Sequence, residues 1–287
     1  MKIAFIFTVI LIGFFMLSGC FKRPPEGMVA IPAGEFFMGT DAIDENNFAA
    51  EHGIVKPWFI DEGPAHKVFL PLYYIDEHEV TNTQYAKFII ATKNTPPPYW
   101  ERGVYAKGSE SYPVVMVTWH EAQAYCSSRD GRLPSEAEWE KAAKGIEKNT
   151  YPWGEIFDVK KANIGGLSGD LSPVGSYPAG KSPYGLFDMI GNVWEWTRSP
   201  FKAYPGFKPV VVKLPSHKKK EKLTPDFDGD HRTAVSGGFN SSVLTTRLTT
   251  RRNTSRGQAT DGLGMRCSAS AVPGLDIARS ILRVDLP

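Results

Sequence analysis

The chain has 287 residues, with 33 lysine and arginine residues against 31 aspartate and glutamate residues and a formal net charge of +2. This near balance excludes a nucleic-acid-binding protein that relies on a strongly basic face. Glycine and proline together make up about 17% of the chain, against an average of about 12%, and aromatic residues make up 12%. These proportions indicate a loop-rich globular protein whose aromatic side chains fill an irregular core.

The N-terminus has the pattern of a bacterial lipoprotein signal. Lys2 is followed by an apolar run over residues 3–17, which is shorter than the about 20 residues of a membrane-spanning helix but suits a signal peptide. The run ends in Leu-Ser-Gly-Cys, which resembles a lipobox with Cys20 as the lipid acceptor. We therefore predict a lipoprotein signal peptide over residues 1–19, with an ordinary signal peptide or an anchor helix as the alternatives.

A lipid on Cys20 would anchor the protein to the membrane through a tether over residues 20–26. This predicts a bacterial envelope protein that faces the periplasm or the exterior, and Phe21 in place of aspartate favours the outer membrane. Two cysteines then remain, Cys126 and Cys267. An even pair outside the cytosol predicts a disulfide, with two buried free thiols as the alternative.

Local patterns predict three helices and several short strands within one domain over residues 27–270. The clearest helix start is Ser135, because Glu138 three residues later completes a capping box. In chain order, we expect a hairpin over 27–39, a strand over 66–75, a helix capped by Thr81, a short strand over 113–117, a helix over 120–128 capped by Thr118, a helix capped by Ser135, and a strand over 235–239.

The remaining segments lack a regular period. Residues 41–63 and 150–200 are expected to be loops, the latter ordered because it is rich in aromatic residues. Residues 202–232 form a variable insert with a basic run that we interpret as a solvated surface loop rather than a binding patch. Residues 271–287 are expected to be a C-terminal tail with a short amphipathic stretch.

Taken together, the motifs of the chain resemble the formylglycine-generating enzyme, or sulfatase-modifying factor, family. The most specific is Tyr-Gly-Leu-Phe-Asp-Met-Ile-Gly-Asn-Val-Trp-Glu-Trp at residues 184–196. The other matching segments are residues 28–39, 63–68, 79–85, 113–119, 124–126, 131–140, 151–154, 237–238 and 262–267. The resemblance implies one α+β domain related to C-type lectins, poor in regular secondary structure, and it also implies a disulfide between Cys126 and Cys267.

The resemblance further implies calcium as a cofactor, bound at two sites by carboxylate, amide and carbonyl oxygens. The first site would use the side chains of Asp188 and Glu195 and the carbonyl oxygens of Gly191 and Val193. The second site would use Asn163, the Ile164 carbonyl oxygen and Asp170. The alternative is that Asn163 and Asp188 simply cap turns.

The family's copper-dependent chemistry is not expected here. The two thiol positions that follow the Gly-Gly pair carry Ser242 and Arg247, and the active-site serine position carries Phe239. Cu(I) selects thiolate ligands, which a hydroxyl or a guanidinium cannot replace. The six histidines show no paired ligand spacing, so we expect no iron either.

Several arginines follow the altered thiol positions, namely Arg247, Arg251, Arg252 and Arg256. One interpretation is an anion or ligand pocket built from Ser242, Arg247 and Arg251, because guanidinium groups suit carboxylate and phosphate. The alternative is that these arginines face solvent or pair with acidic side chains.

These observations lead to three functional hypotheses. The first is a lipid-anchored binding or assembly module without formylglycine-generating activity, with an envelope protein or a small ligand as its partner. The second is a periplasmic enzyme of altered, oxidoreductase-like chemistry, similar to relatives that act in siderophore maturation. The third is a carbohydrate-binding lectin, by analogy of fold alone.

Overall fold

The computed structural model describes residues 23–54, 56–166, 168–213, 220–227 and 229–271, so the predicted signal peptide, Cys20 and residues 272–287 lie outside the described residues. The helices are α1 (Phe48–Glu51), α2 (Asn82–Thr92), α3 (Trp119–Ser127) and α4 (Glu136–Lys144), with 3-10 turns η1 (Val159–Lys161) and η2 (Pro178–Gly180). The strands are β1 (Met28–Ile31), β2 (Gly34–Met38), β3 (His66–Leu70), β4 (Tyr73–Asp76), β5 (Trp194–Pro200), β6 (Val210–Lys213), β7 (Lys220–Leu223), β8 (Arg232–Val235), β9 (Arg251–Thr254), β10 (Leu263–Gly264) and β11 (Ser268–Ser270). This mixed, loop-rich architecture confirms the predicted α+β fold class.

The three predicted helices form at the predicted caps. Thr81, Thr118 and Ser135 are the N-caps of α2, α3 and α4, and each accepts a hydrogen bond from the backbone three residues on. In each helix the residue at that third position reaches back to the cap, so all three starts are complete capping boxes. These helix starts depend on contacts within four residues, which explains why the sequence alone predicts them.

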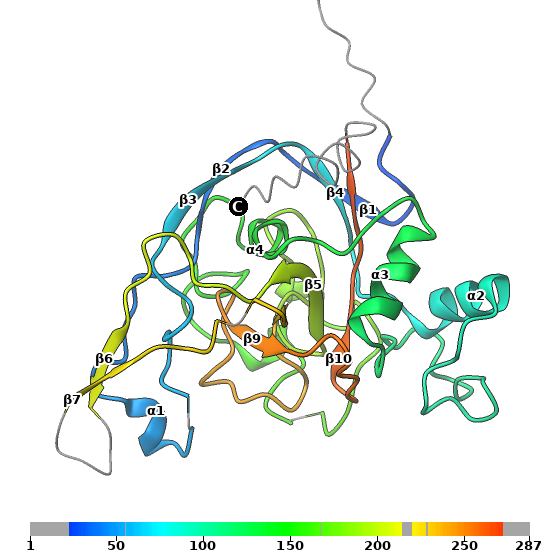
Figure 1. The fold of residues 1–287 in the computed structure, drawn as a ribbon. Coiled ribbons are helices and arrows are strands. Elements are labelled where there is room, and N and C mark those ends of the chain that lie inside the picture. The colour runs from blue at the N-terminus through cyan, green and yellow to red at the C-terminus, as the bar shows by residue number, and fades with distance from the viewer. Residues whose placement is uncertain (1–22, 55, 167, 214–219, 228, 272–287) are drawn as a thin grey trace, which may run out of the picture.

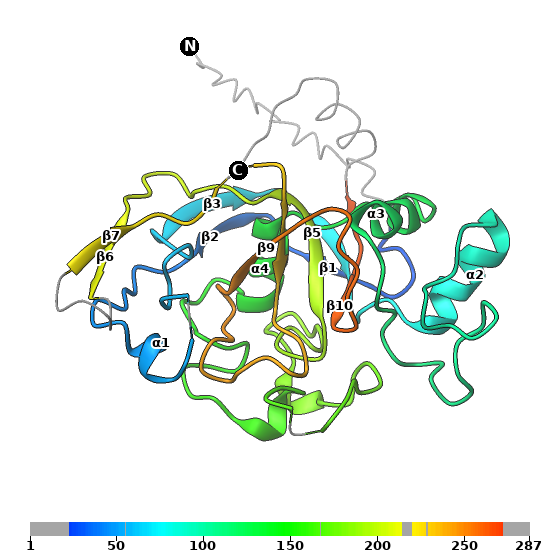
Figure 2. The same cartoon turned by 60° about the horizontal axis from the view of Figure 1, so that its bottom comes forward.

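Two larger sheets and two strand pairs organise the domain. One sheet has the order β1-β4-β11 and the other β10-β5-β8-β9, while β2 pairs with β3 and β6 pairs with β7. In Figure 1 the β2–β3 pair arches over α4, and α2 and the β6–β7 pair lie at opposite ends of the molecule. The turned view in Figure 2 shows the same separation.

The expected hairpin over residues 27–39 is wrong in its pairing. Both strands form, but β1 pairs with β4 and β2 pairs with β3, each antiparallel. In the connection between the two strands, the carbonyl oxygens of Pro32 and Gly34 accept from Lys141 of α4, at 2.7 and 2.9 Å. The two strands thus belong to different sheets, and their connection is held by a lysine more than a hundred residues away.

Two further strand predictions need correction. The expected strand over residues 66–75 is divided at Pro71 into β3 and β4, which join different sheets. The segment 113–117 is not a strand, and only Pro113 makes an isolated bridge, to Thr81. Met116 has a positive φ of 55°, which interrupts the extended backbone.

The loop predictions hold in part. The loop expected over residues 150–200 is wrong at its end, because residues 194–200 form β5, while the described residues of 150–193 contain only η1 and η2 as regular elements. Residues 41–63 include α1. The strand expected over residues 235–239 is instead β8, which ends at Val235. The insert forms the β6–β7 pair, and the described lysines of its basic run, Lys220 and Lys222, are exposed. Residues 214–219 lie outside the described residues.

The predicted disulfide is present. Cys126 in α3 is bonded to Cys267, which directly precedes β11, with the Cα atoms 5.5 Å apart. Both cysteines are fully buried in a core that includes Trp196 and Leu133. In the described part of the chain no helix is both long and apolar enough to cross a membrane.

Acid should weaken this fold through Glu138. Burial alone would raise the pKa of this carboxyl, but Arg132, whose two terminal nitrogens each donate to it at 2.6 Å, lowers the pKa from 4.5 to about 2. The unfolded chain therefore binds this proton first, and the stabilisation present above pH 4.5 is lost as the pH falls towards 2. We expect Glu138 to account for about 3 kcal/mol of that loss.

Urea unfolding of the wild type and of Glu138→Gln between pH 6 and pH 2.5 measures this contribution. The variant should lose most of the pH slope assigned to Glu138. Glu121→Gln is the matched control, because Glu121 fills the same capping position on α3 and accepts from Thr118, with no arginine bonded to it among the described residues. An equal pH slope in wild type and Glu138→Gln would contradict the prediction.

Candidate functional site

The altered thiol positions lie in the irregular segment between β8 and β9. Ser242 is exposed, and its carbonyl oxygen accepts from the hydroxyl of Thr246 (2.9 Å). Phe239 is half-buried and donates its backbone N–H to Asn192 (2.8 Å). Neither side chain offers a soft metal ligand at these positions.

Arg247 fills the second thiol position with a buried ion pair. Its Nη2 lies 2.6 Å from Oε1 of Glu62, its Nε lies 3.4 Å from Oε2, and its guanidinium stacks on the ring of Phe59. Burial alone would raise the pKa of Glu62, but Arg247 and then Lys56 lower it, so this glutamate is charged. Thr249 adds a hydroxyl hydrogen bond to the same carboxylate. The second thiol position is thus occupied by a charged arginine that is paired with Glu62.

Arg251 is also paired rather than free. Its Nη2 donates to Oε2 of Glu136 (3.0 Å), its Nε donates to Oε1, and further donors reach the carbonyl oxygens of Asp61 (2.7 Å) and Lys202 (2.9 Å). The predicted anion pocket of Ser242, Arg247 and Arg251 is therefore not formed as expected. The alternative interpretation, arginines paired to acids, describes Arg247 and Arg251, because both are buried and need a counter-charge.

A cleft does lie beside these ion pairs, between residues 56–62 and β9. Two cavities of about 220 and 320 Å³ share Lys56, Pro57, Arg251 and Arg252 in their walls. Trp194 at the start of β5 contributes its ring, with the guanidinium of Arg252 5.5 Å above it. We take this cleft as the candidate functional site.

Residues 56–62 bring side chains to this cleft that the sequence motifs did not indicate. Asp61 is almost completely buried, and its Oδ2 accepts from Nζ of Lys56 at 2.6 Å. Burial raises the pKa of Asp61, against the opposing effect of Lys56. The run of Pro57, Trp58 and Phe59 before two acidic residues is the signal that could have found them, because it stands out within an otherwise polar loop.

The two predicted calcium sites lie next to each other. Asn163 forms an isolated parallel bridge with Gly191, and the backbone N–H of Asn192 donates to the carbonyl oxygen of Asn163 at 2.7 Å. Gly191 has φ 82°, and a Cβ there would come within 2.2 Å of the Asn163 carbonyl oxygen, so only glycine allows this approach.

The contacts of Glu195 do not fit a calcium ligand. Its two carboxylate oxygens pair with Arg266 at 2.7 and 2.8 Å, and one of them also accepts from the indole of Trp139 at 2.8 Å. Asp188 accepts from the backbone of Gly175 (2.7 Å), and burial raises its pKa to about 6. A cation at this site would face the guanidinium of Arg266 directly, which opposes binding.

A neighbouring carboxylate, Glu79, was also missed. It accepts from the side chain of Asn192 (2.6 Å) and from the backbone of Val193 (3.3 Å), so it shapes the predicted calcium loop. Burial, followed by the charges of Asp188 and Glu195, raises its pKa well above the ordinary value. Glu79 belongs to a motif that matches the family in the sequence, but its hydrogen-bond partners lie more than a hundred residues away.

The second site fits a calcium ion better. The hydroxyl of Ser168 lies 2.5 Å from Oδ1 of Asn163 and 2.6 Å from the carbonyl oxygen of Asp170. Nδ2 of Asn163 also donates to the carbonyl oxygen of Asp170 at 3.0 Å, so both acceptors have donors, and the hydroxyl, amide and carbonyl oxygens lie close together. Ile164 lies next to Asn163 and is buried, whereas the side chain of Asp170 is exposed and accepts from Leu171.

No group of three or more histidine, cysteine, aspartate or glutamate side chains among the described residues could hold a metal ion. The second site would rely on amide, hydroxyl and carbonyl oxygens, which are ordinary calcium ligands.

Residues 16–271 match the family model described as the sulfatase-modifying factor enzyme 1-like domain. Hercynine oxygenase of Mycolicibacterium smegmatis is 33% identical over 247 residues, which cover 74% of this chain and 54% of that protein. The chain therefore spans about half the length of this relative. A mouse (Mus musculus) protein named inactive C-alpha-formylglycine-generating enzyme 2 is 30% identical over 297 residues, covering 85% of this chain and 86% of that protein.

Solved structures share the fold. PvdO from Pseudomonas aeruginosa superposes with a TM-score of 0.62 at 24% identity, covering 85% of this chain and 94% of that chain. CarF gives a TM-score of 0.56 at 19% identity, covering 86% of this chain and 98% of that chain. The motifs, the fold and the match over most of its length together show that the chain belongs to the sulfatase-modifying factor enzyme 1-like family, the formylglycine-generating enzyme family of the sequence analysis.

Proposed function

We propose that this protein is a lipid-anchored binding or assembly module of the bacterial envelope, without formylglycine-generating activity. The observation that carries the proposal is the buried Arg247–Glu62 ion pair at a thiol position. A guanidinium keeps its positive charge at every physiological pH, so it opposes a copper ion as well as failing to bind one. The similarity to a protein named as inactive supports the same conclusion.

A peptide-oxidation assay tests the absence of this activity. The full chain is incubated with copper, oxygen and a cysteine-containing sulfatase peptide, beside an active family oxidase as the positive control. Mass spectrometry should detect no formylglycine product from this chain. Conversion of the peptide well above the protein-free background would refute the proposal.

The membrane anchor rests on the lipobox at Cys20. In a bacterial host, wild-type protein should partition into the detergent phase of Triton X-114, whereas Cys20→Ser should remain in the aqueous phase. Ser18→Ala is the control, because it keeps a small residue before the cysteine. Equal partitioning of wild type and Cys20→Ser would remove the lipid anchor from the proposal.

Asp61 favours a second candidate, an enzyme of altered chemistry. A buried carboxyl whose pKa is raised, beside a lysine and in a cleft, is a candidate acid or base. A gene position beside a biosynthetic cluster would favour this enzyme, and a position beside envelope complexes would favour the binding module.

Calcium at the second site should stabilise the protein. A ligand bound only to the folded state raises the free energy of unfolding, by about 2.7 kcal/mol at a concentration of 100 Kd. We expect EDTA to lower Tm, and added calcium to restore it better than magnesium does. An unchanged Tm after chelation would count against calcium binding at both predicted sites.

A further inference from the structure

The cleft beside β9 contains buried polar atoms that no described residue satisfies. Nε1 of Trp58, Oδ1 of Asp61 and Oδ1 of Asn253 are each buried without a hydrogen-bond partner. All three residues line its two cavities, Trp58 the smaller and the other two the larger. A buried polar atom without a partner is destabilising, so a ligand that supplies the partners gains free energy on binding.

The charges of the cleft leave one cation without a carboxylate. Arg251 is paired with Glu136, and Lys56 is paired with Asp61. Among the described residues the guanidinium of Arg252 has no hydrogen bond or ion pair, and it lies over the ring of Trp194. Arg252 is half-buried, and this desolvation lowers its pKa. An anionic group on a ligand would supply the missing counter-charge.

The two kinds of unsatisfied group specify different parts of one ligand. Arg252 and the indole N–H of Trp58 are donors, so they suit a carboxylate or phosphate. Oδ1 of Asp61 and Oδ1 of Asn253 are acceptors, so they suit hydroxyl donors. Asp61 lines the larger cavity and is 2% exposed, so bulk water does not satisfy its unpaired acceptor.

The walls and the size of the cleft agree with a small, ring-shaped ligand. Trp194 and Phe201 present aromatic surface to the two cavities. The larger cavity, about 320 Å³, lies at the lower end of the range of ligand pockets, about 300–1,000 Å³, and the smaller cavity, about 220 Å³, lies below that range. A polymer would need a longer groove.

We infer that this cleft binds a small polyhydroxylated anion, a sugar acid or a sugar phosphate of monosaccharide size. Its anionic group faces Arg252 and Trp58, and its hydroxyl groups donate to Asp61 and Asn253. This inference names the ligand class of the binding role proposed above and rests on it.

Titration of the full chain with four probes, followed by calorimetry and saturation-transfer NMR, tests the inference. The probes are sodium D-glucuronate, D-glucose 6-phosphate, D-glucose and sodium acetate. Saturable binding of glucuronate or of glucose 6-phosphate is expected, and the tighter of the two tells carboxylate from phosphate. Glucose lacks the anionic group and acetate lacks the hydroxyls, so each should bind at least about tenfold more weakly.

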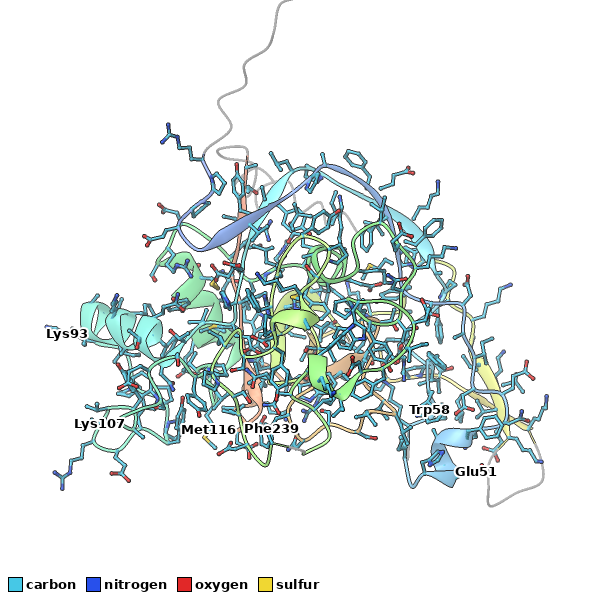
Figure 3. The ribbon with its side chains drawn as sticks, turned by 180° about the vertical axis from the view of Figure 1, so that it is seen from behind. Glu51, Trp58, Lys93, Lys107, Met116 and Phe239 are labelled. Atoms are coloured by element: carbon cyan, nitrogen blue, oxygen red, sulfur yellow. A yellow bond between two sulfur atoms is a disulfide. The ribbon has the colours of Figure 1, made fainter. Side chains whose placement is uncertain are left out.

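Arg252→Gln should weaken binding of the anionic probe at least about tenfold. Because this arginine has no ion pair among the described residues, the variant should fold, and its melting curve checks this. Lys107→Gln makes the same charge change on an exposed residue that Figure 3 places at the opposite end of the molecule from Trp58, and it should bind like wild type. Asn253→Leu removes one acceptor. It should lower the affinity for the sugar anion and leave the weak binding of acetate unchanged.

Several results would overturn the inference. These are no saturable binding of either sugar anion at tens of millimolar, equal affinity for glucose, or unchanged affinity in Arg252→Gln. None of these results affects the peptide-oxidation or detergent-partition experiments, so a failure of this ligand class is distinguishable from a failure of the proposed function.

Discussion

Replacing Cys126 and Cys267 together with alanine is expected to lower the free energy of unfolding by about 4–5 kcal/mol. The disulfide joins residues 141 positions apart, so its loss frees a long loop in the unfolded chain. Urea unfolding followed by tryptophan fluorescence measures the change. Dithiothreitol should lower the free energy of unfolding of the wild type to a similar extent.

The double alanine variant also provides the control for reduction. Dithiothreitol should leave its unfolding curve unchanged, because no disulfide remains within the domain. A difference of less than about 1 kcal/mol between the oxidised wild type and the variant would show that tertiary packing, rather than the cross-link, holds α3 against the segment before β11.

Glu195→Gln is expected to destabilise the fold by about 3–5 kcal/mol. Both Glu195 and Arg266 are completely inaccessible to solvent, so the variant leaves a buried guanidinium without its counter-charge. The remaining donors of Arg266 reach only the carbonyl oxygens of Asp76, Glu77 and Phe187. Urea unfolding gives the magnitude.

Two variants sharpen the interpretation. Adding Arg266→Met to Glu195→Gln should recover part of the loss, because the unpaired charge is removed. Glu35→Gln, which breaks the exposed pair with Lys67, should cost less than about 1 kcal/mol. If Glu195→Gln costs little in either the presence or the absence of calcium, the buried pair is not a main support of the core.

The same variant separates the two roles considered for Glu195. If its role is to neutralise Arg266, the loss of stability should persist in EDTA. A loss that occurs only with calcium present would instead restore Glu195 as a calcium ligand and contradict the reading of its contacts.

The candidate site shows why the sequence could identify the absence of the usual chemistry but not what replaces it. Ser242 and Arg247 at the thiol positions are read directly from the motif spacing. The partner of Arg247, however, is Glu62, which lies 185 residues away. From the sequence, Arg247 could bind an anionic ligand, but in the fold it is paired with the carboxylate of Glu62.

The same limit applies to the calcium prediction. The motif around Asp188 and Glu195 suggested the first site more strongly than the site at Asn163. Arg266 lies 71 residues beyond Glu195 and occupies its carboxylate, whereas the oxygens near Asn163 come from residues within seven positions. Local oxygen clusters can thus be read from a sequence, but competition from a distant arginine cannot.

The sequence by itself determined the family, the α+β class, the starts of α2, α3 and α4, and the pairing of Cys126 with Cys267. A capping box forms within four residues, and a set of motifs in a fixed order identifies a fold family. Both can therefore be recognised from the sequence alone. Tertiary structure alone decided that β1 and β2 enter different sheets, that Arg247 and Arg251 are paired, and that Arg252 is left to face the cleft. These outcomes depend on burial and on charges brought together from distant parts of the chain, and no local pattern encodes which partner a buried charge will find.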